Sequence, residues 1–473
     1  MRKITQVHPV DKSRPAGKLN YLSAIESLHL LERGEITALA LLEDCLAQIG
    51  EFDGLLQAWV HLDCELGKAQ ARAVDEKIRS GQRVGPLAGV PVGIKDIFNA
   101  IDMPTQMGSP IWKGFMPGND ARVVHSLRMA DAVLPGKTVT AEFAVHTPGP
   151  TRNPHDPQCT PGTSSSGSAV AVASYMVPLA LGTQTAGSIL RPASYCGIYG
   201  FKPSFGLIPR TGMLKTTDTL DTVGYFARTV EDLELLLGAI RVHGPDYPLS
   251  HAALNDPSRQ EKGSRPWRVA FVRGPKWDDA EAYARTAVEG FAKRLGMEEG
   301  VILEEVALSD DFSKAHDVHG VIYDKTLAYY FKEECRHHTL ISPIMYEIVE
   351  RGKGISLAQY QAGLQEQSRL VQQFDEMLQR YDALLTLTTG GAAQKGLDTT
   401  DRPDTCLIWT LCGAPAVNLP VFSDSRGMPF GAQIIGRRYN DLLLLKFARF
   451  LRGRQLIPQA PNPIPAFLKS AHS

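Results

Sequence analysis

Hydrophobic and polar residues follow each other along this chain with two different periods, one typical of helices and one of buried strands. Apolar residues three and four positions apart predict helices that begin after Ser23 and Thr37, and Ser23 with Glu26 forms a capping-box pattern. Similar signals predict helices over 65–80, 121–129, 281–295 and 356–381, and from 169 onward. Short apolar runs bounded by Gly or Pro predict strands over 87–97, 132–134, 177–181, 267–272 and 383–387. This alternation indicates an α/β fold with a covered sheet.

The domain organisation is simple. Residues 1–20 show no periodicity and are interpreted as an N-terminal arm, and residues 21–473 as a single large domain. The stretch 245–267, rich in Pro, Ser, Asp and Arg, indicates an exposed connection or insertion. Residues 102–168 are dense in Gly, Pro, Ser and Thr between apolar elements, which favours a functional segment over a disordered one.

Composition and charge narrow the class of protein. Hydrophobic residues make up 43% and charged residues 21% of the 473 positions, as in ordinary globular proteins, and the net charge is −1. This balance predicts neither a nucleic-acid nor a membrane partner, and the longest apolar stretch, 169–182, is too short to span a bilayer. Seven scattered cysteines without metal-type spacing favour free thiols and a cytoplasmic location.

A run of hydroxyl residues from Thr160 to Ser168, with Ser164 at its centre, is the strongest local signal for chemistry. It lies directly before an Ala/Val-rich helical segment. Hydroxyls and backbone N–H groups at a helix N-terminus stabilise developing negative charge. The alternative interpretation is a polar linker or a helix cap.

Two weaker signals lie at predicted strand ends. The small residues 185–188, which end in Ser188, would let consecutive N–H groups form an oxyanion hole, although a tight turn is the alternative. Lys95 ends the apolar strand that contains Val92 and Ile94. If it is buried, its pKa falls from about 10.4 and the neutral amine can accept a proton from a serine. If it is not, it is an ordinary solvated lysine.

Taken together, these motifs resemble those of the amidase signature family. The match comprises Ser164-Ser165-Ser166-Gly167, Gly187-Ser188, Pro192, the Cys-Gly-x-x-Gly-x-Lys-Pro segment 196–203, and the segments 89–96, 136–138, 142–144, 413–416 and 429–436. It extends over roughly residues 20–455. The resemblance implies a mixed, twisted sheet of about eleven strands covered by helices on both faces.

The resemblance also implies roles for individual residues. Ser188 is expected to be the nucleophile that forms an acyl-enzyme, Ser164 the bridging serine in a cis peptide bond after Thr163, and Lys95 the base. The backbone N–H groups of Thr185, Ala186, Gly187 and Ser188 are expected to form the oxyanion hole. The chemistry of the residues agrees, since a serine nucleophile needs a base and Ser164 can relay protons between Ser188 and Lys95.

The implied reaction is hydrolysis of the C–N bond of a small-molecule amide, without a cofactor. The alternative is an A-type glutaminase subunit of an amidotransferase, which delivers ammonia to a partner. A homodimer is left open. We expect residues 300–400 to line or cap the substrate pocket.

The chain departs from the usual family pattern at four positions. Thr163, Gln184, Ala186 and Leu190 stand where many members have Gly, Asp, Gly and Arg, respectively. An arginine, Arg191, instead follows three residues after the nucleophile, where its planar fork could bind an anionic substrate group. The other interpretation of Arg191 is that it pairs with a buried acid of the scaffold.

A metal site is not expected. His316 and His319 are three residues apart on a predicted helix, but no acidic or histidine constellation completes a ligand set. Phosphate-loop and dinucleotide fingerprints are also missing from the sequence.

Overall fold

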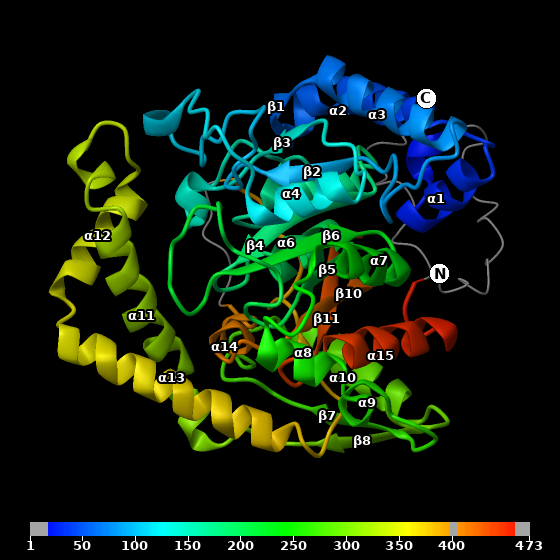
Figure 1. Ribbon diagram of the computed structural model, residues 1–473. Coiled ribbons are helices and arrows are strands. Elements are labelled where there is room, and N and C mark those ends of the chain that lie inside the picture. Colours follow the sequence, from blue (N-terminus) through cyan, green and yellow to red (C-terminus); the bar gives the residue numbers. More distant parts are fainter. Residues whose placement is uncertain (1–17, 398–403, 459–473) are drawn as a thin grey trace.

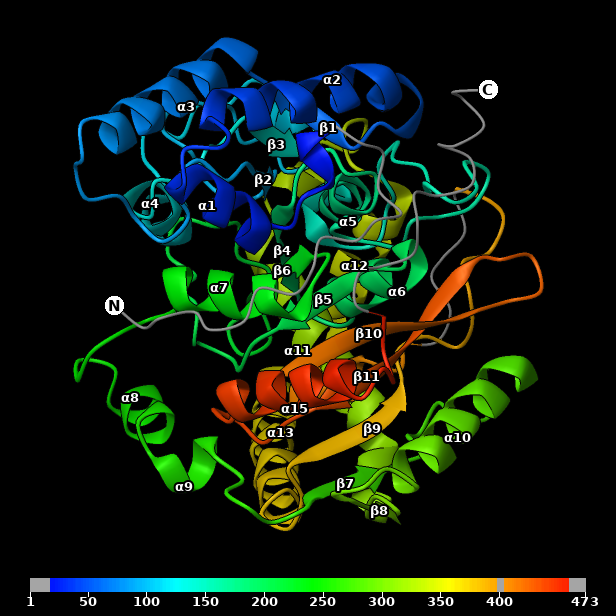
Figure 2. The ribbon, with the colours of Figure 1, turned by 90° about the vertical axis from the view of Figure 1, so that its right-hand side faces the viewer.

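One mixed sheet of eleven strands runs through the part of the chain that the computed structural model describes, residues 18–397 and 404–458 (Figures 1 and 2). The spatial order of its strands is β1-β3-β2-β4-β6-β5-β10-β11-β9-β7-β8. The strands are β1 Trp59–Leu62, β2 Val92–Lys95, β3 Gly136–Thr138, β4 Leu179–Gln184, β5 Tyr199–Lys202, β6 Thr222–Ala227, β7 Trp267–Phe271, β8 Val301–Glu305, β9 Ala383–Leu387, β10 Ala416–Ser423 and β11 Pro429–Ile435. The α/β fold and the size of the sheet, both expected from the sequence, are confirmed.

Helices cover both faces of this sheet. The helices of the described residues are α1 Ala24–Glu32, α2 Ala38–Leu56, α3 Cys64–Arg79, α4 Arg122–Met129, α5 Ser166–Ala173, α6 Leu190–Cys196, α7 Val230–Ile240, α8 Pro248–Leu254, α9 Pro257–Gln260, α10 Ala282–Gly296, α11 Ala315–Tyr330, α12 Pro343–Gly354, α13 Leu357–Met377, α14 Leu407–Leu411 and α15 Asp441–Gly453. Helices α4, α7, α10 and α15 share one hydrophobic cluster, and α5, α6, α13 and α14 share another.

Strand side chains alternate between these two clusters, because successive residues of a strand point to opposite faces. On β4, Leu179 and Leu181 belong to the first cluster, and Ala180 between them belongs to the second. On β9, Leu384 likewise points opposite to Leu385. Burial on both faces explains why these strands read as continuous apolar runs in the sequence.

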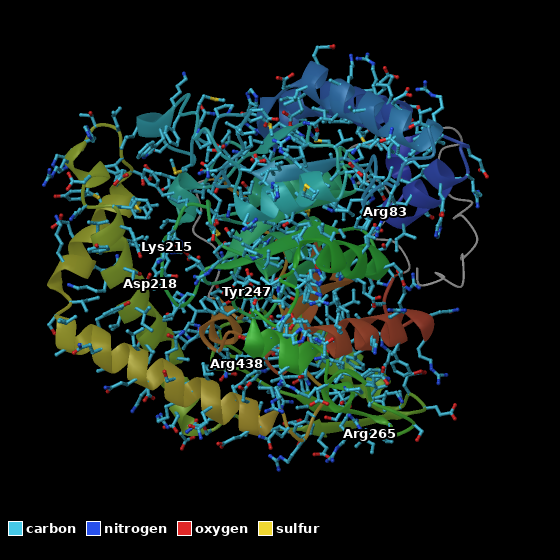
Figure 3. The ribbon with its side chains drawn as sticks, viewed as in Figure 1. Arg83, Lys215, Asp218, Tyr247, Arg265 and Arg438 are labelled. Carbon is cyan, nitrogen blue, oxygen red and sulfur yellow. The ribbon has the colours of Figure 1, made fainter. Side chains whose placement is uncertain are left out.

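A helical lobe, formed by α11, α12 and α13, stands beside the sheet (Figure 1). Two contacts attach this lobe to the rest of the molecule, and they involve Asp218 and Arg438, which are labelled in Figure 3. Tyr330 at the end of α11 donates a hydrogen bond to Asp218 (2.8 Å), and Arg438 pairs with Asp375 on α13 (2.7 Å). Its helix α11 reaches toward the loop that follows β4, where the predicted site lies.

Most predicted elements are present, but three differ from expectation. The strand expected over 87–97 is only Val92–Lys95, because Gly89 has a φ of +76° and Pro91 has no N–H to donate. The strand expected at 132–134 begins later, at Gly136, after Pro135. The stretch 245–267 is not only a connection, since α8 and α9 each begin at a proline, the residue favoured in a first helical turn.

Three further expectations concern the ends of the chain and its chemistry. Residues 1–17 of the expected N-terminal arm lie outside the described residues, whereas Leu19–Tyr21 form a 3₁₀ turn whose Leu19 N–H donates to Asp44 (2.6 Å). All seven cysteines are free thiols. Among the described helices, none combines the length and the apolar character that a bilayer crossing requires.

Candidate active site

The predicted base, Lys95, lies at the end of β2 and is fully buried. Strand β2 runs parallel to β4, with Ile94 opposite Leu181, so the carboxyl ends of both strands meet at one edge of the sheet. This pairing brings Thr183 of β4 beside the amine. Lys95 Nζ lies 2.9 Å from Thr183 Oγ1.

The hydroxyl run supplies two more neighbours of the Lys95 amine. Nζ lies 2.8 Å from Ser164 Oγ and 3.0 Å from Ser165 Oγ. The peptide bond between Thr163 and Ser164 is cis, as the resemblance implied. Ser164 and Ser165 directly precede α5, and both are buried.

Burial decides the protonation state of this amine. Loss of hydration lowers the pKa of Lys95 well below its ordinary value of 10.5, although the Asp221 carboxylate partly opposes this. A lysine in this environment gives up its proton much more readily than a solvated one. The alternative of a solvated lysine is therefore wrong.

Ser188 lies on the loop between β4 and α6, close to the Ser164 segment. The residue is 8% exposed, and its hydroxyl forms no hydrogen bond with another described residue. Two contacts join the loops. Arg191 donates to the carbonyl of Thr163 (3.4 Å), and a Cβ built on Gly162 would lie 3.1 Å from Pro192 Cα. The structure thus brings Lys95 and Ser164 into direct contact and puts Ser188 on the neighbouring segment.

Arg191 forms a buried ion pair with Asp404, the residue two positions before the N-cap of α14. The Asp404 carboxylate also accepts hydrogen bonds from the backbone N–H groups of Cys406 (2.8 Å) and Leu407 (3.1 Å). The pair packs on Gly187, where an added Cβ would lie 2.6 Å from the carboxylate. Of the two interpretations left open by the sequence, this contact favours pairing with an acid of the scaffold.

Several residues that support the loop 185–188 were not anticipated. Asp221 accepts a hydrogen bond from the Thr185 hydroxyl (2.8 Å), and Thr410 donates to the Ala186 carbonyl (2.7 Å). The side-chain oxygen of Gln184, one of the departures from the family pattern, accepts from the N–H groups of Ile189 (2.8 Å) and Leu190 (3.0 Å). Asp221 and Thr410 are distant from the loop in sequence, and no local motif marks them, whereas Gln184 directly precedes the loop and only its hydrogen bonds were unforeseen.

The two histidines of α11 contact this region as hydrogen-bonding residues. His319 donates to the carbonyl of Thr185 (2.9 Å), and His316 to the carbonyl of Asp404 (2.9 Å). Within the described ranges no group of three His, Cys, Asp or Glu residues is arranged to hold a metal ion. Both histidines come from the range 300–400, in which residues near the pocket were expected.

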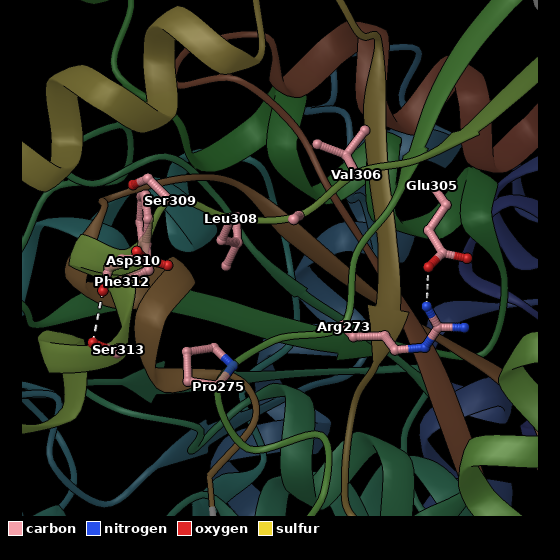
Figure 4. A pocket seen from close by; sticks show the side chains of 10 residues that line it. Arg273, Pro275, Glu305, Val306, Leu308, Ser309, Asp310, Phe312 and Ser313 are labelled. Atoms are coloured by element: carbon pink, nitrogen blue, oxygen red, sulfur yellow. Dashed lines mark hydrogen bonds and ion pairs between the residues drawn. The ribbon is translucent and has the colours of Figure 1, made fainter.

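Two surface hollows lie outside this arrangement. One, of about 300 Å³, is lined by Arg273, Pro275, residues 305–310, Phe312 and Ser313, and the Arg273–Glu305 ion pair lies in it (Figure 4). The other, of about 540 Å³, opens at the sheet edge beside Asp96 and Thr140. Neither is lined by Lys95, Ser164 or Ser188.

Comparison with known proteins shows to which family the chain is related. The model of the Amidase family matches residues 40–445. The A-type subunit of the glutamyl-tRNA(Gln) amidotransferase of Chloroflexus aggregans is 34% identical, over 91% of this chain and 95% of the relative. Among solved structures, the peptide amidase of Stenotrophomonas maltophilia has a TM-score of 0.80 and 25% identity, over 93% of this chain and 98% of the other.

A third relative points the same way. The A-type subunit of the glutamyl-tRNA(Gln) amidotransferase of Thermotoga maritima has a TM-score of 0.77 and 26% identity, and the match covers 94% of this chain and 98% of the other. The chain therefore belongs to the amidase signature family.

Proposed function

We propose that this protein hydrolyses the C–N bond of a small amide through an acyl-enzyme on Ser188. The observation that carries the proposal is the fully buried Lys95 amine, which lies 2.8 Å from the Ser164 hydroxyl. A buried amine with a lowered pKa is the form of lysine that can act as a general base near neutral pH.

The hydrogen bonds around Lys95 support a direction for the proton path. The Ser165 hydroxyl donates its hydrogen to the Thr183 carbonyl (3.1 Å), so toward Nζ it can only accept. A neutral amine has two N–H donors and one lone pair. We assign the second donor to Thr183, so that the lone pair is left for the hydroxyl hydrogen of Ser164.

The reaction then proceeds in two balanced halves. Ser188 Oγ attacks the amide carbonyl while its proton passes to Ser164, whose own proton moves to Lys95. The negative charge on the carbonyl oxygen is stabilised by the N–H groups of residues 185–188. Return of the proton through Ser164 releases the amine or ammonia, and water attacks the acyl-enzyme by the same path. No cofactor is needed.

Two measurements test this proposal. A fluorophosphonate reacts with a nucleophilic serine and loses fluoride. It should label the wild-type protein at Ser188, as peptide mass spectrometry would show. Ammonia or amine release should be measured over a panel of amides, carbamoyl compounds and ureas. Labelling at another serine, or turnover that survives Ser188→Ala, would refute the mechanism.

A second candidate is an A-type glutaminase subunit that passes ammonia to a partner. It is favoured by the names of the relatives at 34% identity, which are A-type subunits of amidotransferases. The isolated chain distinguishes the two uses. Rapid release of ammonia from simple amides, without a partner or ATP, supports the hydrolase. If glutamine is the one amide that is hydrolysed, and if its hydrolysis requires an added partner protein, the result supports the glutaminase.

A further inference from the structure

The loop 185–188 is held from its carbonyl side by two buried side chains that come from distant parts of the chain. His319 on α11 donates to the carbonyl of Thr185 (2.9 Å), and Thr410 on α14 donates to the carbonyl of Ala186 (2.7 Å). The exposed fraction is 4% for His319 and 0% for Thr410. Neither side chain has a place in the proton path proposed above.

Holding a carbonyl also fixes the N–H group of the next residue, because the peptide unit is rigid and planar. The Thr185 carbonyl shares its unit with the N–H of Ala186, and the Ala186 carbonyl shares its unit with the N–H of Gly187. The next carbonyl, of Gly187, accepts from the Arg191 N–H (2.9 Å) in the first turn of α6. Three successive N–H groups, those of Ala186, Gly187 and Ser188, are thus oriented from behind.

The donor at the Thr185 carbonyl is well defined. A carbonyl oxygen can only accept, so Nε2 of His319 carries the hydrogen. Burial lowers the pKa of His319 to about 4, so the ring is neutral at physiological pH. Its plane is held by stacking on Tyr323, at 5.4 Å and 26°.

The donor at the Ala186 carbonyl is equally constrained. The Thr410 hydroxyl accepts a hydrogen bond from Nε2 of Gln184 (2.9 Å), which leaves its own hydrogen for the carbonyl. Gln184 is held in turn by the N–H groups at the start of α6. Donors fixed in advance stabilise developing charge better than donors that must reorient during the reaction.

We propose that His319 and Thr410 are positioning residues that aim the N–H groups of the oxyanion hole. The inference rests on the function proposed above, since it assumes that negative charge develops beside residues 185–188. It predicts that loss of either donor weakens stabilisation of the transition state and leaves binding of the unreacted ligand unchanged.

The test uses the full-length protein and a fluorophosphonate probe, because attack by Ser188 builds negative charge on the phosphoryl oxygen. Thr410→Val keeps the shape of the side chain and removes its hydroxyl. We expect the maximal labelling rate to fall about 10- to 100-fold, less than the loss of a whole oxyanion donor, while the concentration for half-maximal rate changes less than twofold. Thr410→Ser should restore the rate to within about threefold.

A disruptive and a conservative substitution can be compared at His319 in the same way. His319→Leu removes the donor, whereas the side-chain amide of His319→Gln can reach the same carbonyl. We expect the leucine variant to label about 10- to 100-fold more slowly and the glutamine variant to recover most of the rate. The control is Thr326→Val, a buried substitution on α11 whose hydroxyl bonds, among the described residues, only to carbonyls of its own helix. It should label like wild type.

The outcomes separate the two proposals. If Ser188→Ala abolishes labelling but Thr410→Val and His319→Leu label at the wild-type rate, the positioning role is wrong and the mechanism stands. An equal loss of rate in the conservative and disruptive variants also overturns it, because the donor would then not matter. If Ser188→Ala is still labelled, the proposed function itself fails.

Discussion

The amine of Lys95 is surrounded by hydroxyl groups rather than by a paired carboxylate. Its hydrogen-bond partners are Ser164, Ser165 and Thr183. A partner carboxylate would hold the proton on the amine, whereas hydroxyls and burial release it. By contrast, Lys137, buried on the adjacent strand β3, is paired with Asp96 at 3.1 Å. Lys95 is therefore suited to the chemical task proposed above, and Lys137 to a structural one.

Removal of the proposed nucleophile should be decisive for activity. We expect Ser188→Ala to lower kcat by at least about 10⁴-fold, because groups that act as one unit fail together. Circular dichroism and thermal melting should stay unchanged, since the Ser188 hydroxyl has no hydrogen-bond partner among the described residues.

The matched control is Ser166→Ala. The Ser166 hydroxyl is buried near the same site and has no partner among the described residues. We expect this variant to keep wild-type kcat. Comparable losses in both variants would point to a general disturbance of the loop instead of a missing nucleophile.

The protonation state of Lys95 should set the acid limb of the pH profile. The amine is active when neutral, so kcat/KM should rise as pH increases through its pKa and fall as pH drops below it. Because burial lowers that pKa, the limb must lie well below 10.5. Lys95→Arg should be inactive throughout the profile, since a guanidinium does not lose its proton. A limb that stayed near 10.5 would contradict the assignment of Lys95 as the base.

At the scale of elements, the site joins parts of the chain with very different sequence signals. The hydroxyl run, the segment 185–188 and the strand that ends in Lys95 were identified from the sequence, because each carries its signal locally. Thr410, Asp404 and Asp221 were not, since their roles arise only when α14 and the segment before β6 pack on the loop. His319 was noted as half of a histidine pair, but the carbonyl that it contacts is 134 positions away.

The fold shows the same division. The alternation of strands with helices predicted the α/β class, and the strand Ala383–Leu387 was predicted with its observed bounds. The order of the strands in the sheet could not be predicted from this alternation, because the pairing of strands that are distant in sequence depends on tertiary packing. The resemblance supplied the number of strands. Local breaks such as the positive φ of Gly89 shortened elements that the apolar pattern alone had extended.

The contact between α6 and the start of α14 predicts how Arg191 behaves. Its charge is balanced by Asp404, so it should add little preference for anionic substrates. We expect Arg191→Lys to change KM for an acidic amide and for a neutral amide by the same factor. A larger rise for the acidic amide would restore Arg191 as a substrate-binding residue.

The same ion pair should contribute to stability. Asp404→Ala removes one partner of a buried pair, which typically costs about 3–5 kcal/mol in the free energy of unfolding. Urea denaturation would measure this loss. Asp278→Ala is the control, because the Asp278 side chain is 96% exposed and its removal should leave the midpoint unchanged.

At the scale of the molecule, the centre of the sheet is completed by the last strands of the chain. Strand β10 pairs with β5 on one side and with β11 on the other, and β11 pairs with β9. A chain that ends at Gly413 would leave β5 and β9 as bare edges. We expect such a chain to aggregate, as size-exclusion chromatography would show, because unpaired edges recruit other strands.

Supplying residues 414–473 as a separate polypeptide in the same cell should restore soluble protein, since the missing strands can then add to the waiting edges. If the shortened chain were monomeric with a native near-ultraviolet spectrum, the hairpin β10–β11 would not be needed to close the sheet.

This strand order has a consequence for the newly made protein. The ribosome releases Lys95, Ser164 and Ser188 long before the hairpin β10–β11 that joins the two parts of the sheet. Until then the nascent chain carries the residues proposed as nucleophile and base without the supports that come from residues 404–410. A chain whose translation stops early would therefore carry these side chains without the contacts that hold the loop 185–188 in place.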